Sequence, residues 1–273
     1  MSQIRISVIT ICLNAAEELP RTIESVLAQD FCDIEYIIKD GGSTDDTNAV
    51  IDGYRKKFSE KGIEFKVINE PDTGIYDAMN QCVRQSVGEY INFMNAGDCF
   101  YSEHVLSDIA AAISSTSADI IYGDCAVYEY GRFFKFPKSI ERIEHAMPFS
   151  HQSCFARASF LREHPFDTGY RYSADYDFLL TAHDLKASFA DAGVTVCITT
   201  ADGVSSLRHR DTMMETALIL KNHGINVSTD KMLRIKQFVL DHFPVCVKKY
   251  IRGRQIKKRG QSFDALTPPW FVI

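Results

Sequence analysis

Three aspartates each follow a run of apolar residues that is typical of a buried strand. Asp40 follows Ile34–Lys39, Asp72 follows Ile63–Ile68, and Asp98 follows Glu89–Met94. Because the carboxyl ends of parallel strands meet at one edge of a sheet, we expect the three carboxylates to gather there. Such oxygen ligands suit a divalent cation, and that cation suits a diphosphate. A sugar nucleotide offers both a diphosphate and a ring of hydroxyls.

The elements that would position these aspartates alternate between strand and helix. Further strands are predicted at Ile4–Ile11 and Asp119–Tyr122, and helices at Glu17–Gln29, Val50–Phe58, Ile75–Ser86 and Glu103–Ser114. This alternation predicts an α/β fold with a mostly parallel sheet covered by helices on both faces.

The second half of the chain has a less regular pattern. Cys125–Phe136 is typical of a hairpin turning at Tyr130 and Gly131, Asp175–Leu185 of a helix, and Ser188–Ile198 of a strand. From Asp211 the pattern is helical to about Gly260, with breaks near Gly224 and Pro244.

Composition excludes several classes of protein. The chain has 273 residues, 45% of them hydrophobic and 24% charged, which is typical of a globular protein. A net charge of −6 argues against a general nucleic-acid binder. The eight cysteines form no C-x-x-C pair and mostly lie in apolar runs, which favours a reducing cytoplasm over a disulfide scaffold. We expect no signal peptide and no membrane span.

Three common enzyme motifs are missing from the sequence. Leu13-Asn14-Ala15-Ala16 follows the first strand where a dinucleotide-binding enzyme needs glycines. The sequence also has neither a P-loop motif nor the G-x-S-x-G motif of an α/β-hydrolase. A carboxylate-rich strand edge is what remains.

Several motifs occur together and in order along the first three quarters of the chain. They are Ile6–Asn14, the Asp40–Thr47 segment DGGSTDDT, the Glu70–Asn80 segment EPDTGIYDAMN, the Asn95–Asp98 segment NAGD, Ser150-His151-Gln152, Ser173–Asp177 and Gly203-Val204-Ser205. This set resembles family 2 glycosyltransferases with the GT-A fold, and more closely the subgroup that acts in bacterial capsule, colanic-acid and O-antigen assembly. The likeness reaches about residue 206.

The resemblance implies a role for each matched residue. Asp175 corresponds to the general base that activates the acceptor hydroxyl, and we favour it over Asp177. Asp98 corresponds to the last aspartate of the family's metal motif, which would hold Mg²⁺ or Mn²⁺. The substrate-binding residues implied are Thr10, Asn14, Asp40, Asp72, Asn95 and His151, with Asp40 at the nucleobase, usually uracil.

One matched position departs from the family pattern. Asn95 occupies the place of the first metal-motif aspartate, so it offers a carbonyl oxygen without a charge. We interpret it as a variant of the site.

The resemblance implies an inverting, metal-dependent glycosyltransferase in bacterial surface polysaccharide synthesis. Its donor would be a nucleotide sugar, with UDP as the carrier, and its acceptor a saccharide or a polyprenyl-linked saccharide. Two alternatives remain open. One is a protein that binds a nucleotide sugar without turnover, which would not need Asp175. The other is a metal-dependent nucleotidyltransferase, which usually needs a glycine-rich basic loop where this chain has Asn14–Glu17.

We expect a GT-A domain over residues 1–210 and a helical, basic extension over residues 211–273. Residues 248–273 hold seven Lys or Arg against one acid, Asp264. Two interpretations of this extension remain open: a helix docked on the domain with a solvated basic end, and an anchor on an anionic membrane surface with Trp270 and Phe271 in the interface. We hypothesise the second, a peripheral protein on the cytoplasmic face of the membrane.

Overall fold

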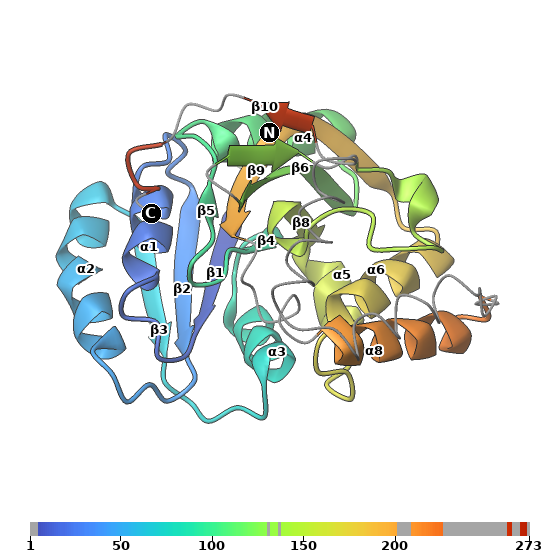
Figure 1. Cartoon of the computed structure of the whole chain (residues 1–273). Coiled ribbons are helices and arrows are strands. Elements are labelled where there is room, and N and C mark those ends of the chain that lie inside the picture. The colour runs from blue at the N-terminus through green and yellow to red at the C-terminus, as the bar shows by residue number, and fades with distance from the viewer. Residues whose placement is uncertain are drawn as a thin grey trace.

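The computed structural model describes residues 5–129, 132–135, 138–200, 209–225, 261–263 and 268–271. These residues form a ten-stranded mixed sheet with helices on both faces (Figure 1). Eight of the strands run in the order β10-β7-β6-β8-β4-β1-β2-β3. The other two lie off this path: β9 pairs with β6, and β5 pairs with β9. The predicted α/β class is confirmed, and the sheet is mixed because its second half is mostly antiparallel.

Four parallel strands make the half of the sheet that carries the predicted site. They are β1 (Ile6–Cys12), β2 (Ile34–Asp40), β3 (Glu64–Ile68) and β4 (Tyr90–Phe93). β1 lies between β2 and β4, and β3 pairs on the far side of β2. Their carboxyl ends therefore share one edge, as the strand pattern predicts.

Two hydrophobic cores cover the two faces of this sheet. The first receives α1 (Leu19–Leu27), α2 (Thr47–Lys61) and α4 (Val105–Thr116). The second receives α3 (Ile75–Gln85), α5 (Ala158–Glu163), α6 (Ala174–Asp184) and α8 (His209–Asn222). Alternate residues of β1 enter opposite cores, with Val8 in the first and Ile9 in the second, as the two-residue period of a strand requires.

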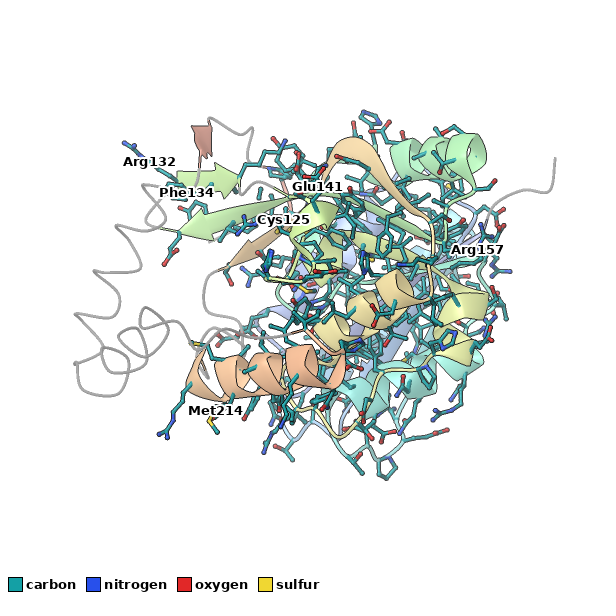
Figure 2. All side chains as sticks on the ribbon, turned by 90° about the vertical axis from the view of Figure 1, so that its right-hand side faces the viewer. Cys125, Arg132, Phe134, Glu141, Arg157 and Met214 are labelled. Atoms are coloured by element: carbon teal, nitrogen blue, oxygen red, sulfur yellow. The ribbon has the colours of Figure 1, made fainter. Side chains whose placement is uncertain are left out.

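The second half of the chain adds β5 (Cys99–Phe100), β6 (Ile120–Glu129), β7 (Arg132–Lys135), β8 (Cys154–Arg157) and β9 (Phe189–Thr200), with short 3₁₀ turns at Ile140–Arg142 and His151–Ser153. The strand predicted at Asp119–Tyr122 is confirmed, but it is the first part of β6, which continues into the predicted hairpin; Figure 2 labels Cys125 and Phe134 on the two strands of that hairpin. The strand bulges at Gly123, where a Cβ would lie 2.5 Å from the Val194 carbonyl oxygen, so only glycine lets β9 approach.

Part of the predicted extension packs on the rest of the chain. α8 contributes Ile219 and Leu220 to the core with α6. Strand β10 (Gln261–Phe263) pairs with β7. The Trp270 indole donates a hydrogen bond to the Phe100 carbonyl oxygen, 2.9 Å away, and Phe271 is buried. The basic cluster between residues 248 and 259 and the motif Gly203–Ser205 lie outside the described residues.

Within the part of the chain that is described, no helix is both long and apolar enough to cross a membrane.

Candidate active site

Asp40 ends β2 in a tight turn that holds its carboxylate. The Ser43 amide donates to Asp40 Oδ2 at 3.0 Å, the Ser43 hydroxyl donates to Oδ1, and Asn48 Nδ2 lies 3.4 Å from Oδ2. Gly42 has a φ of +92°, a left-handed conformation that glycine adopts without strain. The side chain is only 2% exposed, so the turn fixes where these oxygens point.

Lys39 joins the Asp40 turn to the loop that carries Asp72. Its ammonium has no exposed surface and donates to Asp72 Oδ2 at 2.9 Å, to the Asp40 carbonyl at 3.1 Å and to the Glu70 carbonyl at 2.5 Å. A Cβ on Gly41 would lie 3.4 Å from Asp72 Oδ2, so the two loops touch. Sequence reasoning missed Lys39, although a lysine inside an apolar strand is the signal that could have found it.

Asn14 lies against the same turn, at the end of β1. Its Oδ1 accepts a hydrogen bond from the Thr44 amide at 2.8 Å, and its own amide donates to Ser43 Oγ at 2.7 Å. Asn14 has a φ of +50°, a left-handed conformation that asparagine tolerates better than most residues. The structure therefore brings Asn14, Asp40 and Asp72 together.

Thr10 is not brought to this edge. Its side chain is fully buried, where its hydroxyl donates to the Met94 carbonyl at 2.7 Å and lies 2.8 Å from the Tyr36 hydroxyl. Thr10 shares the strand face of Val8 and Cys12, which packs under α1 and α2. The structure therefore places the Thr10 side chain in the core and not with Asn14, Asp40 and Asp72.

The Asn95–Asp98 turn follows β4 and is held by helix α1. The Asp98 amide donates to the Asn95 carbonyl at 3.0 Å. Thr22 of α1 donates through its hydroxyl to the Asp98 carbonyl at 2.6 Å and accepts from the Gly97 amide at 3.0 Å. Gly97 adopts a φ of +96°, which closes the turn. Helix α1 therefore holds the backbone of the turn that carries Asn95 and Asp98.

The Asp98 carboxylate is largely desolvated. Burial raises the pKa of Asp98 to about 6, and three neighbours oppose this rise: a hydrogen bond from Gln152 and the charges of His151 and Arg21. Gln152 Nε2 lies 2.8 Å from Asp98 Oδ2. Gln152 was not singled out from the sequence, although it lies in the matched Ser150–Gln152 motif.

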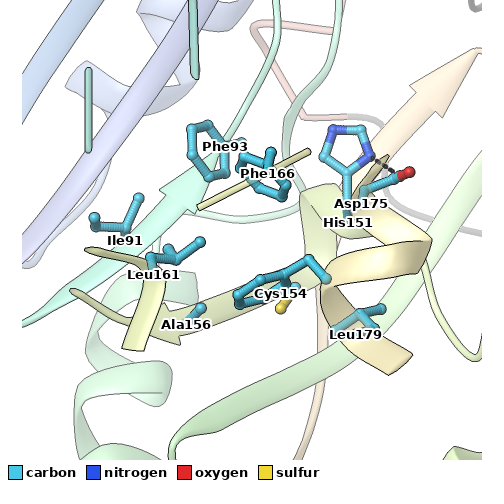
Figure 3. A pocket seen from close by; sticks show the side chains of 10 residues that line it. Ile91, Phe93, His151, Cys154, Ala156, Leu161, Phe166, Asp175 and Leu179 are labelled. Atoms are coloured by element: carbon cyan, nitrogen blue, oxygen red, sulfur yellow. Dashed lines mark ion pairs between the residues drawn. The ribbon is translucent and has the colours of Figure 1, made fainter. Parts of the chain in front are cut away.

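His151 connects the metal-motif turn to Asp175. Its Nε2 lies 3.2 Å from Asn95 Nδ2, and its Nδ1 lies 3.3 Å from Asp175 Oδ2 (Figure 3). Asp175 is in the first turn of α6, where the helix dipole favours a negative charge. Four residues predicted from three motifs, Asn95, Asp98, His151 and Asp175, thus form one connected cluster.

Asp177 faces elsewhere and holds α8. Its Oδ1 lies 3.1 Å from His223 Nε2, and His223 Nδ1 lies 2.6 Å from Asp184 Oδ2. These contacts of His223 with Asp177 and Asp184, called the His223 clasp below, support the preference for Asp175 over Asp177 as the candidate base. His209 starts α8, and its side chain lies outside the described part of the structure.

The turn fits a divalent cation that arrives with phosphate oxygens. Among the described residues, no group of three His, Cys, Asp or Glu side chains is placed to hold a metal. The turn offers the Asp98 carboxylate and Asn95 Oδ1, which is buried without a hydrogen-bond partner within the described chain. Mg²⁺ is commonly held by one or two carboxylates together with substrate phosphates, so these two residues suit a shared cation.

A small pocket lies beside His151 and Asp175 and is almost wholly apolar. His151 and Asp175 stand at its rim, and Phe93, Phe166 and Leu161 line its interior (Figure 3). Most of its lining residues are buried core side chains.

Comparison with known proteins identifies the class. The model of glycosyl transferase family 2 matches residues 7–179, which is more than half of the chain. The chain therefore belongs to glycosyl transferase family 2.

Individual relatives agree with this family. A PGL/p-HBAD biosynthesis glycosyltransferase of Mycobacterium bovis is 32% identical over 178 residues, which cover 63% of this chain and 67% of the relative. An uncharacterized glycosyltransferase of Mycobacterium tuberculosis is 32% identical over 192 residues, or 65% and 68% of the two chains.

Solved structures share the fold at low sequence identity. S. aureus TarS 1–349 in complex with UDP-GlcNAc has a TM-score of 0.65 and 19% identity, covering 84% of this chain and 69% of its own. Mannosyltransferase PcManGT from Pyrobaculum calidifontis, in complex with GDP-Man and Mn²⁺, has a TM-score of 0.59 and 15% identity, covering 75% and 59%. The protein is a glycosyltransferase with the expected GT-A type of fold.

Proposed function

We propose that the protein is an inverting glycosyltransferase that takes a sugar from a UDP-linked donor. Its acceptor is a saccharide or polyprenyl-linked saccharide in bacterial surface polysaccharide synthesis. The observation that carries the proposal is the connected cluster in which His151 lies between Asn95 of the metal-motif turn and Asp175. UDP-GlcNAc in the TarS structure, which shares the fold, supports a nucleotide-sugar donor.

Asp175 acts as the general base in a single displacement. The acceptor oxygen attacks the anomeric carbon from the face opposite the diphosphate, and its proton passes to the Asp175 carboxylate. The new glycosidic bond forms as the bond from the anomeric carbon to the diphosphate oxygen breaks, and the diphosphate leaves with the electron pair. One displacement inverts the anomeric centre, and no covalent sugar–enzyme bond is formed.

The Asn95–Asp98 turn faces the diphosphate. When bound, Mg²⁺ or Mn²⁺ would supply Lewis-acid stabilisation of the charge on the leaving group. Asp98 and the free Asn95 oxygen would hold that ion. At the other end of the donor, Asp40, Asp72 and Asn14 would contact the uridine, with Lys39 keeping the two loops together.

Replacing Asp175 tests the proposal. Asp175→Asn keeps the size of the side chain and removes the base, so UDP release from UDP-sugars should fall by about 10²-fold or more. UDP binding, measured by calorimetry, should stay unchanged, because the uridine contacts lie on β1, β2 and the Asp72 loop. Asp177→Asn, on the same helix turn, is the matched control and should keep turnover.

Two outcomes would overturn the assignment. Full turnover by Asp175→Asn would remove the base from the mechanism. Tight donor binding by the wild-type protein, without turnover on any acceptor, would favour the alternative of a nucleotide-sugar-binding protein.

We further propose that the enzyme is cytoplasmic and associates with the inner face of the membrane through its basic extension. The seven basic residues between residues 248 and 259 support this location, because a polyprenyl-linked acceptor lies in the same membrane.

A further inference from the structure

We propose that Tyr76 is a positioning residue that makes Oδ2 of Asp175 the oxygen that receives the acceptor proton. This inference rests on the proposed role of Asp175 as general base. It assigns a task to a tyrosine that belongs to a different helix, α3, and lies 99 residues earlier in the chain.

The two carboxylate oxygens of Asp175 have different partners. Oδ1 accepts a hydrogen bond from the Tyr76 hydroxyl at 3.0 Å and from the Tyr176 amide at 3.0 Å. A carboxylate oxygen has two lone pairs, so these two donors fill Oδ1. Oδ2 instead faces His151 Nδ1 at 3.3 Å, on the side of the metal-motif turn. Oδ2 is therefore the oxygen with capacity for the proton of an incoming hydroxyl.

Tyr76 remains a donor throughout the physiological pH range. Its side chain is only 7% exposed. Burial and the adjacent charge of Asp175 hold the pKa of Tyr76 well above its usual value of 10.0. The hydroxyl thus keeps its proton and stabilises the charged form of the base without competing for the substrate proton.

Helix α3 is rigidly joined to the segment that leads into α6. Asn80, one turn after Tyr76, donates through Nδ2 to the Phe166 carbonyl at 2.8 Å and accepts from the Phe166 amide at 3.0 Å. The Tyr76 and Phe166 rings also pack with centroids 5.6 Å apart. Two side chains on one face of α3 therefore fix both the approach to α6 and the carboxylate in its first turn.

The test measures the carboxylate directly and needs no donor or acceptor. Protein labelled with ¹³C at aspartate carboxyls is titrated by NMR, and the resonance missing from Asp175→Asn identifies Asp175. In Tyr76→Phe the charged form loses a donor, so the midpoint of this titration should move up by about one pH unit.

Tyr176→Phe is the matched control, because its buried hydroxyl donates to the Ile143 carbonyl while its amide still reaches Asp175. It should leave the midpoint in place even if it lowers thermal stability. An unchanged midpoint in Tyr76→Phe, or an equal shift in Tyr176→Phe, overturns the proposal.

Kinetics separate this inference from the proposed function. With a UDP-sugar that the wild type turns over, Tyr76→Phe should move the acidic limb of the pH profile of kcat to higher pH. It should also lower the plateau value of kcat, with little change in donor KM. If kcat falls but the acidic limb of the pH profile does not move, Tyr76 has only a structural role. Activity retained by Asp175→Asn would instead refute the base assignment, whatever the NMR midpoint of Tyr76→Phe.

Discussion

Asn95 changes the electrostatics of the metal-motif turn. It contributes an oxygen without charge, so Asp98 supplies the only carboxylate between residues 95 and 98. Burial disfavours the charged form of that carboxylate, as the raised pKa of Asp98 shows. The sequence therefore keeps a carboxylate at Asp98 although its charged form lowers the stability of the fold. A site that binds a cation needs such a charge.

Removing the charge of Asp98 should separate activity from stability. We expect Asp98→Asn to lower transferase activity by about 10²-fold or more, since cation and diphosphate lose their carboxylate. Its melting temperature should equal or exceed that of the wild type at pH 8, because the amide escapes the desolvation cost of a buried charge. Activity assays and thermal unfolding check both halves. Asp108→Asn, an exposed carboxylate of α4, is the control, and full activity in Asp98→Asn would remove Asp98 from the site.

Residues that act through distant contacts are harder to assign from the sequence, because their partners lie far away along the chain. Asp40, Asp98 and Asp175 stand out because each lies in a short matched motif. Lys39 and Tyr76 act across 33 and 99 residues, so no local pattern marks their partners. The burial of Thr10 follows from the phase of β1, which places even-numbered positions such as Val8 under α1 and α2.

Among the elements, most of those in the first half were predicted to within two residues, but α2 extends three residues beyond its predicted range at each end and the two-residue strand β5 was missed. Local periodicity defines strands and helices such as β2 and α3, because each buries one face against its neighbours. The four-residue strand β8 was missed, since it exists only through antiparallel pairing with β4 and β6. The 3₁₀ turn before it, which carries His151, was missed for the same reason.

The contact between α6 and α8 should depend on pH. Partial burial lowers the pKa of His223, but hydrogen bonds to Asp184 and Asp177 outweigh this and hold it above its usual value of 6.5. A raised histidine pKa stabilises the fold below the unfolded value, and this stabilisation is lost as pH rises through the folded value. We expect His223→Gln to lower the melting temperature at pH 6 and much less at pH 9.

Thermal unfolding at the two pH values checks the prediction. His164→Gln, a partly buried histidine outside the His223 clasp, serves as the control. An equal drop at both pH values would show that His223 contributes by packing and not by charge.

Across the whole molecule, the two edges of the parallel sheet carry different clusters of polar groups. At the amino edge, buried Glu35 accepts hydrogen bonds from Ser7, Lys66 and the Gly88 amide, and a Cβ on Gly88 would lie 2.4 Å from Ser7 Oγ. At the carboxyl edge, Asn95 Oδ1 lacks a partner within the described residues. The hydrogen-bonded Glu35 cluster stabilises the fold at one edge, and the Asn95 oxygen is available to a ligand at the other.

The charge of the molecule is divided between body and extension. Residues 248–273 carry a net charge of +6 within a chain of net charge −6. Trp270 and Phe271, which we expected in a membrane interface, instead contact Phe100 and pack with Phe133. The basic residues are then the part of the anchor to test, because deleting the whole extension would confuse loss of charge with loss of packing.

Neutralising the basic cluster tests the anchor without removing this packing. Each Lys or Arg near an anionic surface contributes about 1 kcal/mol, so the wild type should float with anionic vesicles at low salt and detach at high salt. A variant with Gln at Lys248, Lys249, Arg252, Arg254, Lys257, Lys258 and Arg259 should stay in the soluble fraction. Gln at Arg55, Lys56 and Lys57 of α2 is the control and should still float. Equal flotation of both variants, or none by the wild type, would show that the extension is not the anchor.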